Sequence, residues 1–207
     1  MQVTQTNINF KARNPQIRFA DDIARKVNKE YPRFSPSKME CFNKSHNYIS
    51  GLEKQWSKLF EMREIVNRKL RLSKNPQKIE ILLNSVKTSK LGNCGEAAEL
   101  TLISAQANGI KNCKKARLET PYGKSFDHAV VLVEDKKPYI IDTWLGFADY
   151  VPNAIKRYQK DFRHCFDFRN SGEKMVIKEA EIFLNDPLPP KTIENIKQSH
   201  PELVLCK

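Results

Sequence analysis

Apolar side chains recur at helical spacing through the first ninety residues of this 207-residue chain. Residues 16–31 carry them at every third or fourth position, which predicts an amphipathic helix that ends at Tyr31-Pro32. A longer helical pattern covers residues 37–70, with Gly51 as a point of interruption, and a shorter helix opens at Asn75-Pro76. We expect these helices to pack together and against the rest of the chain.

The pattern changes after residue 90. A run of small and apolar residues from Cys94 to the stop signal at Asn108-Gly109 predicts a helix that is apolar on several sides and therefore buried. The remaining segments predict strands at 110–118, 127–133 and 139–144, a helix at 153–162, a last strand at 174–183 and a short helix at 192–198. This order of elements predicts an α+β fold, and the length suits one domain.

Cys94 is the first residue with a candidate chemical role, because it stands where a loop gives way to the buried helix. A thiol in the first turn of a helix feels the positive end of the helix dipole and the free backbone N–H groups, and both favour the thiolate. Gly92 and Gly95 lie close to it on either side, so backbone and substrate can approach without an intervening side chain.

A thiolate nucleophile needs a base, and the base needs an orienting group. His128 opens one predicted strand and Asp142 lies near the end of the next, with a polar turn between them. In an antiparallel hairpin His128 would lie opposite about residue 143, which brings Asp142 beside it. Each residue alone is more simply a buried thiol, a satisfied histidine or a turn-forming aspartate. Together, in this order, they favour a Cys–His–Asp triad.

Three motifs carry a family resemblance: Gly-Asn-Cys-Gly-Glu at 92–96, Asp-His-Ala-Val-Val-Leu-Val at 127–133 and Ile-Ile-Asp-Thr-Trp at 140–144. They resemble the papain-like and transglutaminase-like cysteine enzymes. Within that superfamily the chain is most similar to bacterial protein-glutamine deamidase effectors and toxin domains, such as the deamidase domain of Pasteurella multocida toxin. The resemblance covers about residues 85–150. It departs at Thr143, where many relatives have proline between the aspartate and the tryptophan.

The resemblance implies a papain-like/transglutaminase-like core with an N-terminal helical extension. In such a core the nucleophile stands at the N-terminus of a central helix that packs on an antiparallel sheet. The resemblance implies Cys94 as nucleophile, His128 as base and Asp142 as the residue that orients the base.

The oxyanion of the reaction also needs hydrogen-bond donors. The backbone N–H of Cys94 is one candidate, and the Asn93 side chain or a backbone group near Thr88 is the second. We assign Gly95 and Trp144 to the substrate-binding surroundings. Aromatic packing is the simpler explanation of Trp144, which would also shield the His–Asp pair from water.

Such a triad supports deamidation of a glutamine side chain, transfer of the acyl group to lysine, and peptide-bond cleavage. The resemblance favours glutamine deamidation of a protein substrate, with papain-like proteolysis or transglutamination as alternatives. Arylamine acetyl transfer uses a similar triad, but no feature points to acetyl-CoA. A catalytically idle, basic interaction protein on the same fold stays open. No cofactor is expected.

The five cysteines are odd in number and scattered, which does not fit a disulfide framework and favours action in a reducing, cytosolic compartment. Pairs such as Cys41 with His46, or His164 with Cys165, complete no zinc pattern, so no metal is expected. The polar N-terminus lacks the apolar core of a signal peptide, and no apolar run approaches the length of a membrane span. Secretion into a host cell by a route without a cleaved signal peptide stays open.

The formal charge of +12 is uneven. Residues 1–90 hold 19 Lys and Arg against 8 Asp and Glu, whereas residues 91–207 hold 17 against 16. We therefore divide the chain into a flexible leader at 1–14, a basic helical region at 15–87 packed on the core, and a catalytic core at 88–207. The basic region is most simply a solvated helical surface, and the other readings are an acidic protein partner or an anionic membrane. No nucleic-acid-binding fingerprint accompanies it, and we expect a monomer.

Overall fold

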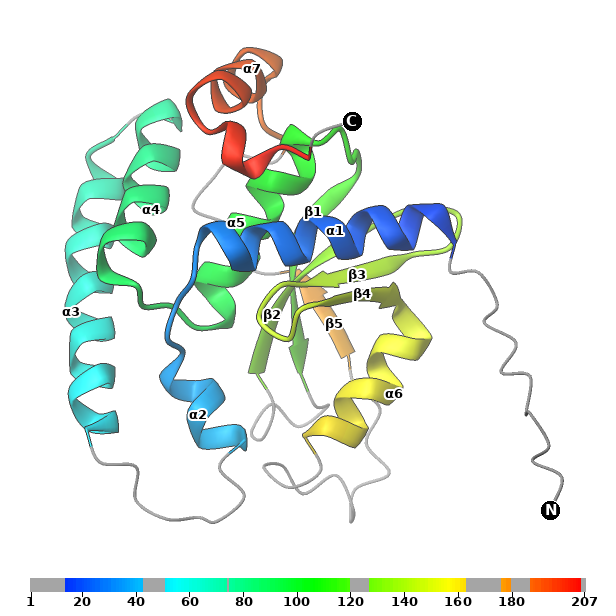
Figure 1. Cartoon of the computed structure of the whole chain (residues 1–207), viewed down its shortest axis with the longest axis horizontal. Coiled ribbons are helices and arrows are strands. Elements are labelled where there is room, and N and C mark those ends of the chain that lie inside the picture. The colour runs from blue at the N-terminus through cyan, green and yellow to red at the C-terminus, as the bar shows by residue number, and fades with distance from the viewer. Residues whose placement is uncertain are drawn as a thin grey trace, which may run out of the picture.

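The computed structural model describes residues 14–42, 51–73, 75–119, 127–162, 176–179 and 187–205. The leader predicted at residues 1–14 lies outside the described residues except for Asn14, which caps α1. The side chains of the paired Cys and His residues at 41, 46, 164 and 165 lie outside the description as well. The described helices are α1 (Pro15–Glu30), α2 (Pro36–Phe42), α3 (Leu52–Arg71), α4 (Asn75–Ser89), α5 (Cys94–Ala107), α6 (Val151–Asp161), α7 (Pro190–Ser199) and the 3-10 turn η1 (Pro201–Leu203). The strands are β1 (Cys113–Glu119), β2 (Asp127–Val133), β3 (Tyr139–Asp142), β4 (Phe147–Tyr150) and β5 (Val176–Glu179) (Figure 1).

The five strands form one sheet in the order β4-β3-β2-β1-β5, and every described pairing is antiparallel. Together with the helices around it, this sheet makes the fold α+β, as predicted. The long helical pattern at 37–70 divides into α2 and α3, and Gly51, with φ of 80°, stands directly before α3. A left-handed backbone at that point suits glycine.

The prediction was wrong at the end of the 139–144 strand. Strand β3 stops at Asp142, residues 143–146 form a tight turn, and β4 follows at once. Gly146 takes a φ of 78° in this turn, which lets the chain reverse within four residues. Strand β4 was not predicted, because a strand of four residues has too few positions to show an alternating pattern.

The two faces of the sheet pack against different helices, because alternate side chains of a strand point to opposite sides. On one face, Val131 and Ile141 pack against α1 and the middle of α5. On the other, Val130 and Ile140 pack against Tyr158 and further apolar side chains of α6. The sheet is therefore covered on both sides, and its centre is dry.

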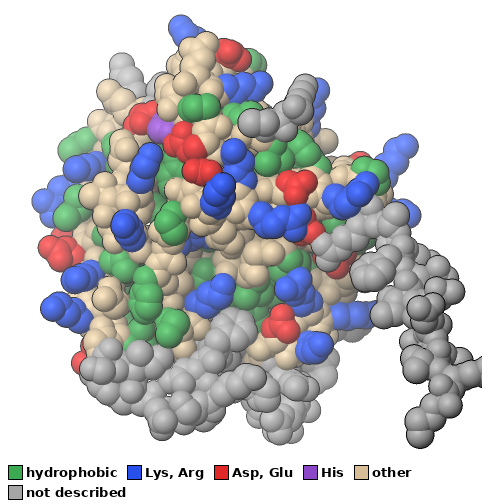
Figure 2. Space-filling model, viewed as in Figure 1, with side chains coloured by type: hydrophobic (Ala, Val, Ile, Leu, Met, Phe, Trp, Pro, Cys, Tyr) green, Lys and Arg blue, Asp and Glu red, His purple; other side chains and the backbone are tan. Residues whose placement is uncertain are grey.

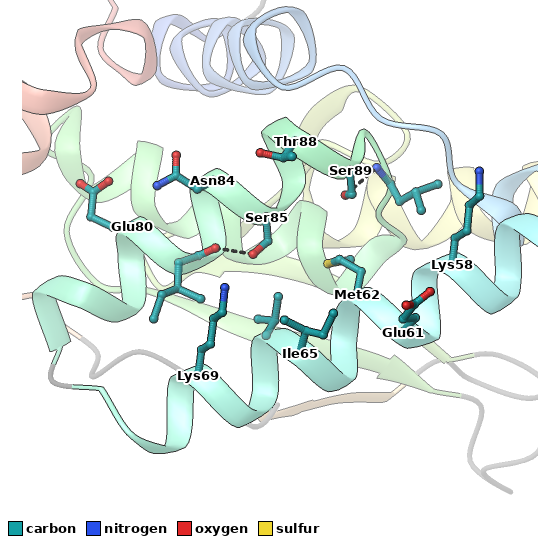
Figure 3. Close-up of a pocket in the computed structure, with 13 residues that line it drawn as sticks. Lys58, Glu61, Met62, Ile65, Lys69, Glu80, Asn84, Ser85, Thr88 and Ser89 are labelled. Carbon is teal, nitrogen blue, oxygen red and sulfur yellow. Dashed lines mark hydrogen bonds between the residues drawn. The ribbon is translucent and has the colours of Figure 1, made fainter.

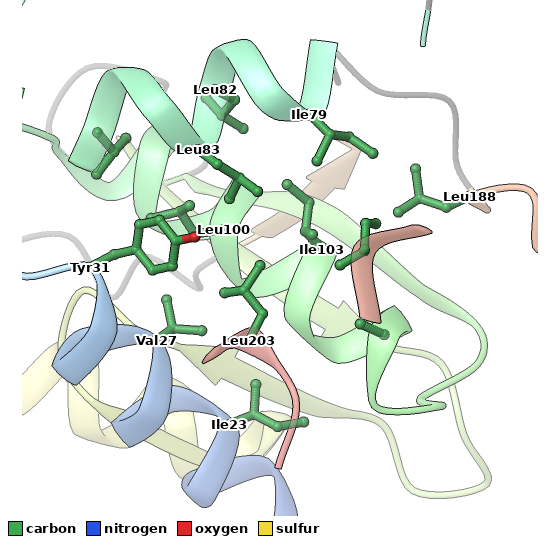
Figure 4. Close-up of a cluster of buried hydrophobic side chains, with 13 residues drawn as sticks. Ile23, Val27, Tyr31, Ile79, Leu82, Leu83, Leu100, Ile103, Leu188 and Leu203 are labelled. Atoms are coloured by element: carbon green, nitrogen blue, oxygen red, sulfur yellow. The ribbon is translucent and has the colours of Figure 1, made fainter. Parts of the chain in front are cut away.

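Helix α5 is enclosed along most of its length, as the sequence predicted. Every residue from Ala97 to Ala107 is buried. On the side away from the sheet, Leu100 and Ile103 pack with Ile23 of α1, Leu83 of α4 and further apolar side chains of α4, α7 and η1 (Figure 4). Helices from the basic region thus share a hydrophobic core with the rest of the chain.

Helix α3 lies at the outer edge of the molecule (Figure 1). Only Leu59, Val66 and Leu70 of its twenty residues are buried, so most of its length faces solvent. On the face shown in Figure 2, Lys and Arg side chains are dispersed, with Asp and Glu between them.

Candidate active site

Cys94 is the first residue of α5, and Asn93 is the residue that caps this helix. The carboxylate of Glu96 accepts a hydrogen bond from the backbone N–H of Asn93 at 2.9 Å, as in a capping box. Cys94 is half-buried, and together with Ala97 it packs against the sheet face that α6 covers. The start of α5 therefore holds a partly accessible thiol among the first-turn N–H groups of the helix.

His128 and Asp142 form a buried pair. The ring Nε2 of His128 lies 2.7 Å from Oδ2 of Asp142, and the side chains are 2% and 1% exposed. The structure thus brings together the two residues that the sequence predicted to lie side by side.

The register differs from the predicted one, and the difference matters. Leu132 pairs with Ile140 and Val131 with Ile141. Continued along the strands, this register places Asp142 opposite Val130. His128 lies two residues before Val130 on β2, so its side chain is on the same face of the sheet as that of Asp142. The predicted register, with His128 opposite residue 143, would have sent the two side chains to opposite faces, because a one-residue slip inverts a strand. The observed loop of five residues between the paired ends of β2 and β3 sets the productive register.

The imidazole of His128 is held in its charged form. Burial by itself lowers the pKa of His128, but the charge of Asp142 and the hydrogen bond to it outweigh burial, and the Cys94 thiol adds a further hydrogen bond and charge. The pKa of His128 rises from 6.5 to about 10 as a result. The thiol of Cys94 is thus one of the hydrogen-bonding partners of the ring.

The Asp142 carboxylate is fixed by hydrogen bonds to both of its oxygens. Its Oδ2 accepts a hydrogen bond from the Tyr158 hydroxyl at 2.9 Å, and its Oδ1 accepts one from the Leu145 N–H at 2.9 Å. Burial raises the pKa of Asp142, but the charge of His128 and these hydrogen bonds bring it below its ordinary value. The carboxylate stays ionised and points at the imidazole.

Aromatic rings enclose the His–Asp pair. The ring of Trp144 lies 4.9 Å from that of His128, and Tyr158 and Phe162 lie at 5.5 and 6.0 Å between ring centroids. Trp144 is itself 6% exposed. The expected packing role of Trp144 is confirmed, and its position also keeps water from the pair.

Thr143, which follows the triad residue Asp142 directly in the sequence, has contacts of its own. Its hydroxyl shares a hydrogen bond with that of Thr101 on α5, and its carbonyl accepts one from Asn28 of α1 at 2.7 Å. The turn after Asp142 is therefore tied to both helices, and proline could not supply the hydroxyl contact.

Arg63 of α3 was missed by the sequence analysis. Its guanidinium makes two hydrogen bonds to Glu96, of 2.6 and 2.8 Å, and it lies close enough to Cys94 to feel its charge. Arg33 is half-buried near the site, and desolvation lowers its pKa to about 10 against the opposing charges of Asp142 and Glu96. Neither arginine stood out in the sequence. Helical periodicity does not distinguish an inward-facing arginine such as Arg63 from a solvated one, and Arg33 lies in the connection between α1 and α2, where no periodic pattern applies.

The remaining predicted site residues are placed as follows. Asn93 is 5% exposed, and its Oδ1 accepts hydrogen bonds from the segment that opens α2. Gly95 lies in the first turn of α5, and a Cβ at this position would meet no atom within 4 Å. Thr88 lies near the end of α4 and lines a groove between α3 and α4 of about 580 Å³ (Figure 3). That groove contains neither Cys94 nor His128, so the structure gives Thr88 no part in the site.

Within the described residues, no cluster of three or more His, Cys, Asp or Glu side chains is placed to hold a metal ion. None of the described helices is long and apolar enough to span a membrane. Comparison with protein-family models found no match, and comparisons with curated proteins and with solved structures found none either. The site must therefore be interpreted from its own chemistry.

Proposed function

We propose that the protein is a cysteine-dependent amidohydrolase, and that its substrate is the side-chain amide of glutamine in a protein. The observation that supports this proposal is the buried His128–Asp142 pair, with the Cys94 thiol at a helix N-terminus within reach of the same imidazole. The finer fold assignment, a papain-like/transglutaminase-like core, is part of the proposal. An antiparallel sheet packed on a helix that begins with the nucleophile is compatible with it.

In the proposed reaction, the Cys94 thiolate attacks the amide carbonyl carbon, and a tetrahedral oxyanion forms. First-turn N–H groups of α5, beginning with that of Cys94, are the candidate donors to it. His128 then gives its proton to the departing nitrogen. Because Nε2 is held by Asp142, the proton passes through Nδ1. The carbon–nitrogen bond breaks, ammonia leaves, and a thioester remains on Sγ.

Water completes the cycle. His128 takes a proton from water as the oxygen adds to the thioester, and the carbon–sulfur bond breaks to return the thiolate. The products are glutamate and ammonia. If a lysine amine replaced water the product would be an isopeptide crosslink, and if the first amide were a backbone peptide the chain would be cut.

The test is peptide mass spectrometry of candidate acidic proteins after incubation with the enzyme. We expect glutamine to be converted to glutamate by the wild-type protein and by Cys113→Ala, which removes a buried thiol outside the site. Cys94→Ala and His128→Ala should give none, and Asp142→Asn should lose most activity because it favours the wrong tautomer. Crosslinks or chain cuts in place of conversion would replace deamidation by one of the alternatives, and full activity of His128→Ala would refute the triad.

A second measurement addresses the catalytically idle alternative. Cys94 should react with iodoacetamide near neutral pH faster than the buried Cys113, since it is half-buried and faces an imidazolium. An inert Cys94 in the folded protein would favour the idle alternative.

A further inference from the structure

The segment that leads into α2 runs beside the nucleophile loop. The N–H of Phe34 donates to the carbonyl of Lys90 at 2.8 Å, and the N–H of Gly92 donates to the carbonyl of Phe34 at 3.1 Å. These two bonds make a parallel β-bridge between Phe34 and Leu91. The next residue, Ser35, is consequently held next to Asn93.

The hydroxyl of Ser35 joins two parts of the candidate site. It accepts a hydrogen bond from Nε1 of Trp144 at 2.7 Å and donates one to Oδ1 of Asn93 at 2.8 Å. The directions are settled by chemistry, because an indole N–H can only donate and the hydroxyl has one proton to give. The N–H of Ser37 donates to the same Asn93 oxygen at 3.3 Å, which agrees with this assignment.

The three side chains joined by these hydrogen bonds are buried. Ser35, Asn93 and Trp144 are 7%, 5% and 6% exposed. Without this hydroxyl, the buried indole N–H of Trp144 would have to find another partner, and the amide oxygen of Asn93 would keep the longer hydrogen bond from the Ser37 N–H but lose the shorter one. Both side chains would therefore move.

The same segment also holds the backbone of Trp144. The ammonium group of Lys38 donates to the Trp144 carbonyl at 2.6 Å and lies 5.7 Å from the centre of its ring. Trp144 is thereby held at its carbonyl by Lys38 and at its indole nitrogen by Ser35, two residues of one short segment.

We infer that Ser35 is a positioning residue that sets the placement of the nucleophile relative to its base. Asn93 caps the helix that begins with Cys94, and the Trp144 ring packs on His128, so the Ser35 hydroxyl links the two halves of the triad. This role rests on the proposed function. It concerns residues 58 and 109 positions away from Ser35 in sequence, so it depends on the tertiary fold.

The test compares Ser35→Ala with Ser37→Ala. Ser37 stands two residues away, is less buried, and its hydroxyl has only a 3.4 Å contact with that of Ser35, so it is a matched control. We expect Ser35→Ala to lower kcat on a glutamine substrate by about 10- to 100-fold, with KM changed less than about threefold, because the groups are misplaced and binding is intact. Ser37→Ala should behave as wild type.

Alkylation of Cys94 by iodoacetamide, measured against pH, provides a readout that needs no substrate. In Ser35→Ala the rate profile should move to lower rates, because the thiol is less well placed beside the His128 ring. A profile identical to that of wild type and Ser37→Ala would overturn the inference. If the protein catalysed no amide chemistry but the profile still moved, the proposed function would fail and the coupling through Ser35 would stand.

A second variant, Trp144→Phe, distinguishes a specific effect of the Ser35 hydroxyl from a general loss of folding. Trp144→Phe keeps an aromatic ring on His128 but has no N–H for Ser35 to accept. Adding Ser35→Ala to Trp144→Phe should therefore shift the alkylation profile less than Ser35→Ala does in the wild type. Equal shifts in the two backgrounds would show that the coupling does not pass through the indole.

Discussion

The hydroxyl of Tyr158 donates a hydrogen bond to Oδ2 of Asp142 at 2.9 Å, the same oxygen that faces Nε2 of His128. Both side chains are buried, and burial with the neighbouring carboxylate raises the pKa of Tyr158 well above its ordinary value, so it stays a donor. A hydrogen bond to an ionised group is stronger than one between neutral groups. Tyr158 therefore holds the carboxylate in line with the imidazole.

We expect Tyr158→Phe to destabilise the protein and to lower turnover. Loss of a buried hydrogen bond to a charged group typically costs about 1–3 kcal/mol in the free energy of unfolding. Tyr139→Phe is the matched control, because Tyr139 of β3 is also buried but its hydroxyl interacts with Gln16, away from the triad. Denaturant unfolding and a glutamine-deamidation assay would measure both effects. Turnover of Tyr158→Phe equal to that of Tyr139→Phe would contradict a role for the hydroxyl.

The stability of the fold should depend on pH through His128. Its pKa is about 10 in the folded chain against 6.5 ordinarily, so the folded state binds the proton more tightly. This contribution is fully present below about pH 6.5 and is lost as the pH rises towards 10. Asp142, whose pKa is lowered, contributes above its ordinary value of 3.8 and loses that contribution as the pH falls further.

The check is a series of thermal or denaturant unfolding measurements from about pH 5 to about pH 10, a range that begins below the ordinary pKa of 6.5 and reaches the folded value of about 10. Wild type should lose more stability across this range than His128→Gln, which has no titrating ring at this position. Parallel curves for the two proteins would mean that the pair does not contribute through protonation.

Substitution of the two glycines beside the nucleophile by alanine should change the free energy of unfolding in different ways. A Cβ on Gly92 would lie 3.1 Å from Cδ of Arg33 and 3.1 Å from Cβ of Glu96, so one of these neighbours must move. On Gly95 it would meet nothing within 4 Å, and the residue is helical. We expect Gly92→Ala to cost about 1–3 kcal/mol of stability by overpacking. Gly95→Ala should be neutral or stabilising by up to about 1 kcal/mol.

Unfolding free energies of the two variants check this expectation, and alkylation of Cys94 reports whether the nucleophile loop has shifted. Gly92→Ala should also slow the alkylation, because Arg33 and Glu96 support that loop. Equal free energies of unfolding for the two variants would mean that Arg33 and Glu96 can move away from the added methyl group at no cost.

The basic first half should act in attachment to a partner and not in bond-making. Lys54, Lys58 and Arg68 are exposed on α3, away from the triad. Reversing their charges should raise the apparent KM on a natural protein target, and the effect should weaken as salt shortens the Debye length, about 8 Å at physiological ionic strength. Turnover of a small glutamine amide should barely change. A KM that is unchanged and insensitive to salt would leave these side chains as a solvated surface only.

The sequence alone determined the kinds of elements and the three candidate catalytic residues. Helical and strand periodicity is a local property, and it predicted α1, α5, β1 and β2 to within a few residues. The positions of Cys94 before a helix, His128 at the start of a strand and Asp142 near the end of the next were likewise readable in order.

Only the tertiary structure decided which side chains meet. A one-residue difference in the β2–β3 register separates a touching His128 and Asp142 from a pair on opposite faces, and turn composition does not resolve one residue. The contacts of Ser35 with Trp144 and of Arg63 with Glu96 join segments 109 and 33 residues apart. Such contacts arise from how helices pack around α5, and a serine or arginine has the same local pattern whether it faces the site or the solvent.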